Sequence, residues 1–291
     1  MIQLNKIASM LSVILFSKVL MLSILFTNCA RLQNTSLQTT GMPTGFPWPV
    51  FLLNYYDYNN GSGWASAFLI KRTPVVGAAP KWFIVTAAHT ALFSKEIYII
   101  VDGNRYELSF HNAMFDRRFT NNLIYEGGRM IGGPDYDLFF FEMSDTLRNP
   151  LNHYIQNPDL QINLLETHPI EDDLQSFDNL IAIGYGRPDT NSPHKKSLIY
   201  LKKDKMEGLP DDGNSLHVNY DVGDSIVVPG DSGGMVVGVK KITSTRLEYK
   251  AIGIISGSDS ERMGFTILSE ERLTRQVDDN GSPIFRVLGC E

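Results

Sequence analysis

From residue 46 onward the chain is a series of short runs rich in β-branched and aromatic residues, separated by Gly, Pro, Asn and Asp. Runs of about four to eight such residues are typical of β-strands, and many of them at close spacing indicate a sandwich or barrel. No long run keeps a helical period, and residues 270–276 are the best short helix candidate. The predicted strands are 50–55, 64–71, 82–86, 97–101, 138–143, 180–184, 198–201, 216–220, 235–239, 250–255 and 265–268.

A polar stretch containing Pro and Asn, residues 144–178, divides these strands into two groups. A chain of 291 residues is long enough for one large all-β unit or for two small domains with cores of their own. No internal repeat is visible, so composition alone supports the division. We therefore predict two β-barrel halves.

The composition excludes some classes of function. The net charge is −6 and no tract is rich in Lys or Arg, so nothing in the sequence favours a nucleic-acid partner. The two cysteines, Cys29 and Cys290, are too few for a disulfide-stapled scaffold. No Cys/His cluster has zinc spacing, and we expect no metal or organic cofactor.

The N-terminus is typical of an export segment. Lys6 precedes an apolar stretch, residues 7–26, which Lys18 interrupts. Residues 25–29, Leu-Phe-Thr-Asn-Cys, are similar to a degenerate bacterial lipobox, in which Cys29 is lipidated. Lipoprotein, simple secretion and a retained anchor all stay open, and each predicts an extracytoplasmic protein. Membrane attachment through the N-terminus belongs to the first and third of these alternatives.

The strongest motif is the pentapeptide Gly-Asp-Ser-Gly-Gly at residues 230–234, directly before a predicted strand. A nucleophilic Ser needs a tight turn that exposes its hydroxyl and aims backbone N–H groups at an oxyanion, and flanking glycines permit that shape. An ordinary Gly-rich loop would explain three of these residues. A given pentapeptide is expected by chance at roughly one position in a few million, so we interpret Ser232 as a nucleophile.

Two further segments supply a base and an acid. The run 83–88, Phe-Ile-Val-Thr-Ala-Ala, ends at His89, where small residues let an imidazole pack closely at the end of a strand. Asp137 directly precedes the apolar run 138–141, where a carboxylate needs a hydrogen-bonding partner such as an imidazole N–H. Asp135 is the alternative acid. The histidines without such a context are His111, His153, His168, His194 and His217.

Together these three segments resemble the trypsin-like, chymotrypsin-fold serine peptidases, whose triad follows the order His, Asp, Ser along the chain. Weaker matches to that family are Phe-Pro-Trp-Pro-Val at 46–50, Ala-Phe-Leu-Ile at 67–70 and Ile-Gly-Ile-Ile-Ser-Gly at 252–257. The resemblance covers about residues 46–275.

The resemblance implies an all-β fold of two six-stranded antiparallel β-barrels with the active site in the cleft between them. It implies that His89 is the general base, that Asp137 orients it, and that Ser232 attacks the scissile carbonyl. The N–H groups of Gly230 and Ser232 would form the oxyanion hole. The organisation that follows is an export segment 1–29, a linker 30–45, a peptidase domain 46–275 (barrels at about 46–145 and 160–275) and a C-terminal tail 276–291.

The sequence departs from the family at the activation motif. The family begins its mature chain with Ile-Val-Gly-Gly, whose amino group pairs with the acid before the nucleophile. That acid is Asp231 here, and no such tetrapeptide precedes residue 46. Asp231 therefore needs another partner, or the chain matures differently.

The resemblance also implies a specificity pocket. Ile226 would be its floor, which favours an apolar P1 side chain, although Asp224 lies close enough for a small shift to give an acidic floor. The implied walls are Ser256, Gly257, Ser258 and Gly264.

The function predicted from the sequence is therefore a serine endopeptidase acting on proteins or peptides. The alternative is a catalytically silent binding or scaffold protein on a protease fold, since one fold hosts different functions.

Overall fold

A computed structural model of the chain has two compact units, Met1–Phe46 and Pro47–Glu291. With the exception of Phe46, all described residues belong to the second unit. The structure describes residues 46–58, 61–72, 79–111, 113–121, 124–126, 129–131, 136–166, 171–187, 195–207, 215–219, 226–243, 246–258, 262–274 and 285–287.

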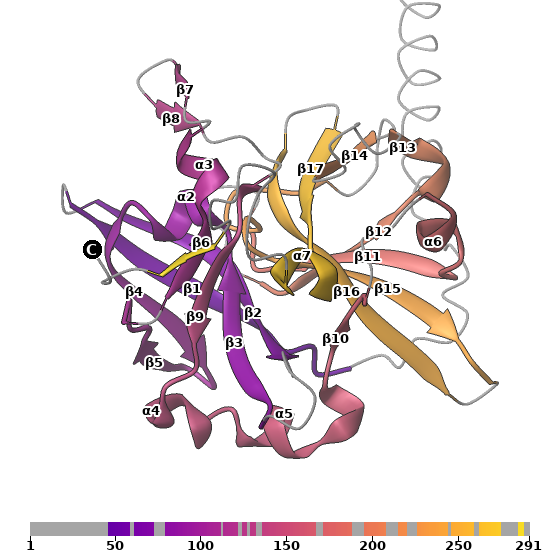
Figure 1. Ribbon diagram of the computed structural model, residues 1–291, viewed down its shortest axis with the longest axis horizontal. Helices are drawn as coiled ribbons and strands as arrows, with labels where there is room; N and C mark the ends of the chain where they lie inside the picture. Colours follow the sequence, from indigo (N-terminus) through magenta and orange to yellow (C-terminus); the bar gives the residue numbers. More distant parts are fainter. Residues whose placement is uncertain are drawn as a thin grey trace, which may run out of the picture. The chain divides into compact units, whose positions relative to one another are not determined.

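The first sheet, drawn from indigo to magenta in Figure 1 with one yellow strand, is antiparallel throughout. Its eight strands follow the spatial order β18 (Phe285–Val287), β6 (Met114–Asp116), β9 (Phe139–Glu142), β3 (Lys81–Thr86), β2 (Ser62–Arg72), β1 (Val50–Asp57), β4 (Ser94–Val101) and β5 (Asn104–Glu107). The central strand β3 buries every residue after Lys81, as a short continuous apolar run predicts.

The second sheet is built from the later part of the chain. Its order is β12 (Ser197–Leu201), β11 (Asn179–Gly184), β15 (Met235–Lys241), β16 (Leu247–Ser258), β17 (Arg262–Ile267), β14 (Ser215–Asn219) and β13 (Met206–Glu207). Neighbours in this order are antiparallel, and a short strand β10 (Asn163–Leu164) adds to β16 in parallel. A separate hairpin is formed by β7 (Ile124–Glu126) and β8 (Arg129–Ile131).

Helices are short in the described part of the chain. They are α2 (Ala88–Ala91), α3 (Arg117–Asn121), α4 (Asp145–Arg148), α5 (Asn152–Gln156), α6 (Glu171–Gln175), α7 (Glu270–Thr274) and the 3₁₀ turns η2 (Pro158–Leu160) and η3 (Lys203–Lys205). The described helices include none with the length and apolar character to cross a membrane.

Each sheet has its own apolar core. The first core gathers aromatic side chains of β6 and β9, with the rings of Phe139 and Phe141 4.7 Å apart between centroids. The second gathers aliphatic side chains from β11, β15 and β16 with Phe265 of β17. Burying such side chains stabilises each half by the removal of apolar surface from water.

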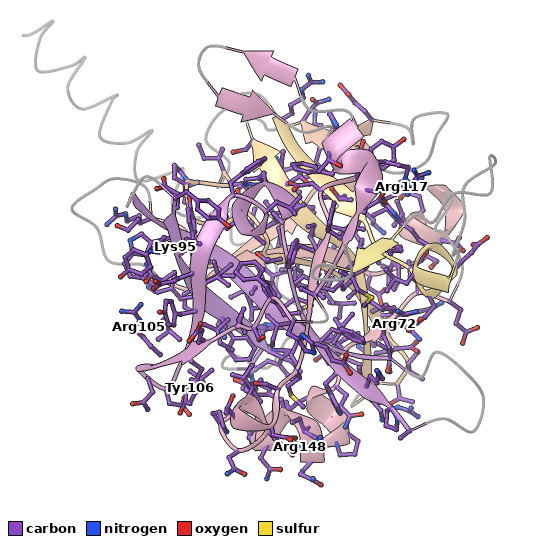
Figure 2. All side chains as sticks on the ribbon, turned by 60° about the vertical axis from the view of Figure 1, so that its left-hand side comes forward. Arg72, Lys95, Arg105, Tyr106, Arg117 and Arg148 are labelled. Atoms are coloured by element: carbon purple, nitrogen blue, oxygen red, sulfur yellow. The ribbon has the colours of Figure 1, made fainter. Side chains whose placement is uncertain are left out.

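The outer strand β5 of the first sheet carries a charged aromatic cluster. The guanidinium of Arg105 lies 4.2 Å from the ring centroid of Tyr98 and 5.6 Å from that of Tyr56. Figure 2 labels Arg105 beside Tyr106 on this strand. A cation on an edge strand disfavours pairing with another chain, so this edge is protected.

The structure confirms the predicted all-β class with two antiparallel strand groups. The polar stretch 144–178 contains strand β10 of the second sheet. Two details were wrong. Each sheet has eight strands instead of six, because pieces of two to four residues extend the edges. Residues 276–291 are not only a tail, because Phe285–Val287 pairs with β6. Runs this short carry no periodicity of their own, so the sequence pattern missed them.

Several predictions fall on residues outside the described part of the chain. These are the export segment and linker up to residue 45, the lipidation candidate Cys29, the alternative acids Asp135 and Asp224, and Cys290. Export and lipidation stay predictions from the sequence.

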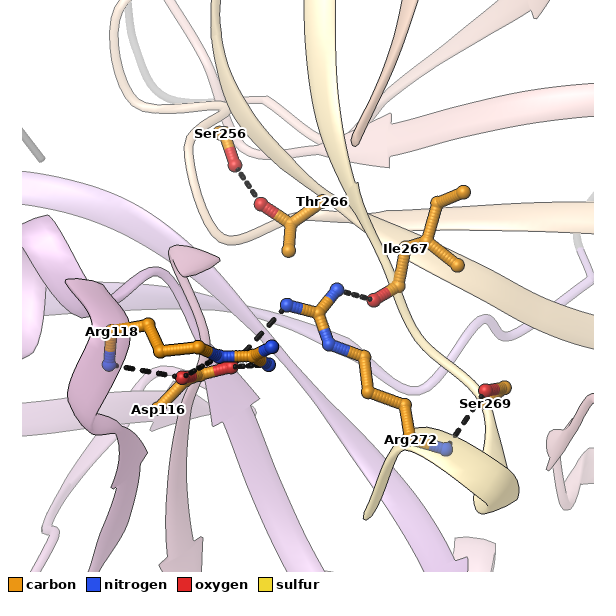
Figure 3. A network of polar contacts seen from close by, with 7 residues as sticks. All are labelled: Asp116, Arg118, Ser256, Thr266, Ile267, Ser269 and Arg272. Atoms are coloured by element: carbon orange, nitrogen blue, oxygen red, sulfur yellow. Dashed lines mark hydrogen bonds and ion pairs between the residues drawn. The ribbon is translucent and has the colours of Figure 1, made fainter. Parts of the chain in front are cut away.

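A buried ion network joins the first sheet to α7 (Figure 3). Asp116 at the end of β6 is fully buried and accepts hydrogen bonds from Arg118, at 2.9 Å to Nε and 2.6 Å to Nη2. Arg272 of α7 lies 3.4 Å from the same carboxylate and donates to the carbonyl of Ile267 at 2.6 Å. The backbone N–H of Asp116 reaches the carbonyl of Leu138 at 3.3 Å. The network therefore supports the strand that follows Asp137.

We predict that Asp116→Ala destabilises the fold strongly, because it leaves two arginine side chains facing an empty acceptor site. Removing one partner of a buried pair typically costs about 3–5 kcal/mol in the free energy of unfolding. Urea denaturation measures the change. Asp145→Ala is the matched control, because its carboxylate is 99% exposed and 3.7 Å from Arg148. Equal stability of the two variants would contradict a structural role for the network.

Candidate active site

His89 lies where the central strand of the first sheet ends. The strand β3 stops at Thr86, and the chain turns through Ala87 into the single-turn helix α2. Ala87 and Ala88 are fully buried, while the His89 side chain stays 35% exposed. Small residues thus anchor the backbone and leave the imidazole partly exposed.

Asp137 holds His89 through both of its carboxylate oxygens. Oδ2 lies 2.7 Å from His89 Nδ1, and Oδ1 accepts the backbone N–H of His89 at 2.8 Å. The carboxylate side chain is only 4% exposed. The contact fixes the ring orientation and places the proton on Nδ1, which leaves Nε2 as the acceptor.

The electrostatics of this pair raise the pKa of His89 above its ordinary value of 6.5. Burial alone lowers that pKa, but the negative charge of Asp137 and its hydrogen bond to the ring outweigh burial. The structure therefore brings together two of the predicted catalytic residues, and their contact raises the basicity of the imidazole.

Ser232 sits on a tight turn before β15. Gly230 has φ 99° and Gly233 has φ 80°, both in the region that side chains rarely adopt. Within the turn, Asp231 N–H reaches the carbonyl of Val228 at 3.0 Å, and Gly234 N–H reaches that of Asp231 at 2.8 Å. The tight Gly-rich turn expected at these residues is the observed conformation.

The turn is also hydrogen-bonded to β16 of the second sheet. Gly233 N–H donates to the carbonyl of Ile255 at 2.7 Å, and Ile255 N–H donates to the carbonyl of Gly234 at 2.8 Å. These two bonds fix the turn against β16, next to Ser256.

Two N–H groups of the turn stay available. Within the described part of the chain, neither Gly230 N–H nor Ser232 N–H donates to any acceptor, while those of Asp231, Gly233 and Gly234 all do. Buried and half-buried backbone donors in proteins are almost always paired, so an available pair beside the half-buried Ser232 is what an oxyanion hole requires. These are the two donors that the resemblance implied.

Gly233 brings the turn at residues 230–234 against the segment that carries His89. A Cβ atom on Gly233 would clash with Ser66 O and Thr86 Oγ1, and it would lie 3.0 Å from Ala87 N. Ala87 is two residues from His89. In this structure, among the described contacts, no hydrogen bond joins Ser232 Oγ to His89. Nucleophile–base bonds are often long without substrate, so the arrangement is compatible with catalysis.

The Asp231 carboxylate accepts hydrogen bonds from groups of the second sheet and its loops. Its carboxylate is fully buried and accepts hydrogen bonds from Gly186 N–H at 2.7 Å, Val228 N–H at 2.9 Å and the Ser197 hydroxyl at 3.2 Å. The partners that Asp231 needs in place of an N-terminal amino group therefore include backbone and hydroxyl donors of the second sheet.

The predicted pocket residues lie near the turn with mixed exposure. Ile226 is 44% exposed, Ser256 shares a 2.5 Å hydrogen bond with Thr266, and Ser258 donates to the carbonyl of Val227 at 3.1 Å. Gly257 pairs with Gly264 across β16 and β17. No described atom would contact a Cβ on Gly257, so this strip of sheet is open among the described residues.

The sequence analysis missed Ser66 and Thr86. Ser66 is fully buried on β2, its N–H donates to the carbonyl of Ser232 at 2.7 Å, and its own carbonyl accepts the Thr86 hydroxyl at 2.8 Å. A single Ser inside an apolar strand was the available signal. The described residues contain no group of three or more His, Cys, Asp or Glu that could hold a metal ion.

Comparison with solved structures matches this chain to serine proteases of low sequence identity. The protease Anisep from Arthrobacter nicotinovorans has a TM-score of 0.48 and 10% identity, over 79% of this chain and 95% of that one. The HtrA-type protease AlgW has a TM-score of 0.43 and 16% identity, over 80% and 61%. A serine endoprotease from Yersinia pestis has a TM-score of 0.44 and 13% identity, over 81% and 66%. No family model matches the chain, and no curated protein matches it.

We predict that Gly233→Ala lowers reaction with a fluorophosphonate probe by about 10²–10³, the cost of misplacing one oxyanion donor. The added methyl group would push the turn away from Ser66 and Thr86. Gly103→Ala is the matched control, because Gly103 has a similar φ of 79° and no described atom near its Cβ position. A Gly233→Ala protein that reacts as fast as the control would contradict the close approach.

We predict an acidic limit of activity set by His89. The ring must be neutral to accept a proton, and its pKa lies above 6.5, so the reaction rate should rise with pH through a midpoint above 6.5. Asp137→Asn removes both effects that raise this pKa and leaves burial, so the midpoint should fall while the rate drops by about 10⁴. Labelling rates measured from pH 4 to about 9 test this, and an unchanged midpoint would exclude His89 as the titrating group.

Proposed function

We propose that this chain is a serine endopeptidase that hydrolyses peptide bonds through His89, Asp137 and Ser232. One observation carries the proposal. The N–H groups of Gly230 and Ser232 have no acceptor among the described residues, and they lie on a turn that contacts the segment carrying the Asp137-bound imidazole. A Gly-rich loop without this function would have no reason to leave those two donors available.

The chemistry follows from these positions. Ser232 Oγ attacks the carbonyl carbon of the peptide as its proton passes to His89 Nε2, and the carbonyl oxygen becomes an oxyanion facing the two N–H groups. Collapse of the tetrahedral intermediate breaks the C–N bond, and His89 gives its proton to the leaving amine. Water then repeats the sequence on the acyl-enzyme and releases the acid. Asp137 stays ionised and stabilises the imidazolium.

The substrate class we propose is protein or peptide, with no metal or organic cofactor and no nucleic-acid partner. Ile226, Ser256, Gly257, Ser258 and Gly264 are proposed to contact the substrate. Action outside the cytoplasm, with or without lipid attachment at Cys29, is the location that the N-terminal sequence supports.

A binding or scaffold protein is the second candidate. It is favoured by the absence, among described contacts, of a hydrogen bond between Ser232 and His89. On that alternative the cleft would retain a peptide without cleaving it, as unrelated functions on one fold permit.

A fluorophosphonate probe separates the two candidates. We expect the wild-type chain to be labelled at Ser232, Ser232→Ala to be unlabelled, and Ser176→Ala to behave as wild type. Ser176 is exposed and its hydroxyl donates only to the carbonyl of Asp173 among the described contacts. Absence of labelling in a wild-type protein shown to be folded by circular dichroism would support the binding protein. A peptide library would then identify the P1 side chain of an active enzyme.

A further inference from the structure

His217 lies on the face of the second sheet that points away from its core. Its neighbours along β14, Leu216 and Val218, both belong to the apolar core of that sheet. Because side chains alternate between the two faces of a strand, the half-buried imidazole points to the opposite face. No motif surrounds this histidine in the sequence, so its neighbours on that face come from other strands.

Two glycines lie beside His217 in the sheet, on strands that are neighbours in Figure 1. Gly264 of β17 is the register partner of His217, and Gly257 of β16 is the register partner of Gly264. A Cβ on Gly264 would meet His217 Nε2 first, at 3.8 Å, and a Cβ on Gly257 would meet no described atom within 4 Å. The two glycines therefore form an open strip on the sheet, which we call the glycine strip, and the Nε2 edge of the imidazole borders it.

The glycine strip adjoins the turn that carries Ser232. Ser258, at the end of β16, donates to the carbonyl of Val227 at 3.1 Å, and the chain runs from there into the turn at residues 230–234. Ile255 of the same strand exchanges two hydrogen bonds with that turn. The strip is thus beside the nucleophile of the proposed reaction, where the P1 side chain of a bound peptide would lie.

The imidazole of His217 makes no hydrogen bond or ion pair with any described residue. Glu207 of β13 is its register partner on the other side, but the Glu207 carboxylate accepts a hydrogen bond from Asn219 at 3.2 Å and lies 3.7 Å from Arg262 Nη1. A half-buried polar group without a partner is unfavourable and is uncommon in folded proteins. The ring is therefore open to a hydrogen bond from a ligand in the glycine strip.

We propose that His217 determines substrate specificity by hydrogen bonding a P1 side chain that ends in a carboxylate or a carboxamide. The proposal rests on the proposed peptidase function and names the substrates of that site. The imidazole N–H can donate to the oxygen of either group. Neighbouring strands lie about 4.8 Å apart, so a side chain that crosses from Gly257 towards the ring needs the length of Glu or Gln. Asp and Asn are shorter by one methylene group.

This proposal differs from the apolar P1 preference that Ile226 suggested in the sequence. The Ile226 side chain is 44% exposed, which is more typical of the rim of a pocket than of an enclosed floor. An apolar P1 side chain over the glycine strip would cover His217 and leave its ring without a partner. Sites that hold an unpaired polar group discriminate against ligands that cannot pair with it.

The first test uses the wild-type chain and four peptides that differ only at P1, which is Glu, Gln, Leu or Lys. We expect kcat/KM for the better of the Glu and Gln peptides to exceed that for the Leu and Lys peptides by about 10-fold or more, the factor that one hydrogen bond supplies. The ratio of the Glu to the Gln value then distinguishes the carboxylate from the carboxamide. A Leu or Lys peptide that is cleaved as fast as both of these would overturn the proposal.

The second test is His217→Leu, which removes both ring nitrogens and keeps a large side chain. We expect the preference for Glu or Gln over Leu at P1 to fall by about 10- to 100-fold. The ratio of two kcat/KM values in one sample does not depend on how much of the protein is folded. His217→Gln should restore part of the preference, because its amide can still donate.

His111→Leu is the matched control, because His111 is exposed and lies between β5 and β6 of the first sheet. It should keep the P1 preference of the wild type. A His217→Leu protein with the same preference as this control would overturn the proposal.

Fluorophosphonate labelling separates this proposal from the peptidase function, because the probe carries no P1 side chain. A wild-type chain that is labelled but prefers Leu or Lys at P1 would overturn the role of His217 and leave the peptidase function in place. A folded wild-type chain that is not labelled and cleaves none of the four peptides would overturn both.

Discussion

The structure depends on one close approach, between the turn at residues 230–234 and the ends of β2 and β3. Gly233 has no side chain because Ser66 and Thr86 occupy the space where a Cβ would lie. The same contact carries the hydrogen bond from Ser66 N–H to the carbonyl of Ser232. Two separately packed sheets thus meet at Ser232, and the position of its turn relative to the segment of His89 is set by backbone packing, which tolerates little change.

Buried carboxylates act at three points around this contact, and each has its own donors. Asp137 orients His89, Asp231 receives N–H groups from the loops of the second sheet, and Asp116 binds two arginines behind the strand that follows Asp137. A carboxylate without partners in these positions would be costly or would take up a proton. Burial of Arg272 lowers its pKa to about 10, although the charge of Asp116 opposes that effect, so this ion pair carries a real desolvation cost. Buried carboxylates of this kind fix the relative positions of their partners as much as they stabilise the fold.

The sequence predicted the parts of the molecule that local patterns encode. Ser232 and His89 stand at the ends of strong apolar runs, and the geometry at Gly230 and Gly233 follows from a turn that only glycine adopts easily. The partners of Asp231 and the role of Ser66 depend on contacts between residues far apart in the chain, 119 positions in the case of Ser66 and Tyr185. No short pattern contains that information. The same holds for the strand Phe285–Val287, which exists because β6 offers an edge.

Among the described contacts no hydrogen bond joins Ser232 to His89, and this contact is the one in the site that a side-chain rotation alone can change. Rotation of a serine hydroxyl between staggered positions moves one atom and leaves the backbone in place. The N–H groups proposed as oxyanion donors depend on two glycines at positive φ and on bonds to Ser66 and Ile255, which cannot rearrange independently. A chain that needed only a peptide-binding cleft would have no use for a backbone turn held from both sides around two available N–H groups. The rigid backbone turn therefore argues for catalysis. The Ser232 hydroxyl can rotate, so binding of a substrate can bring it into contact with His89.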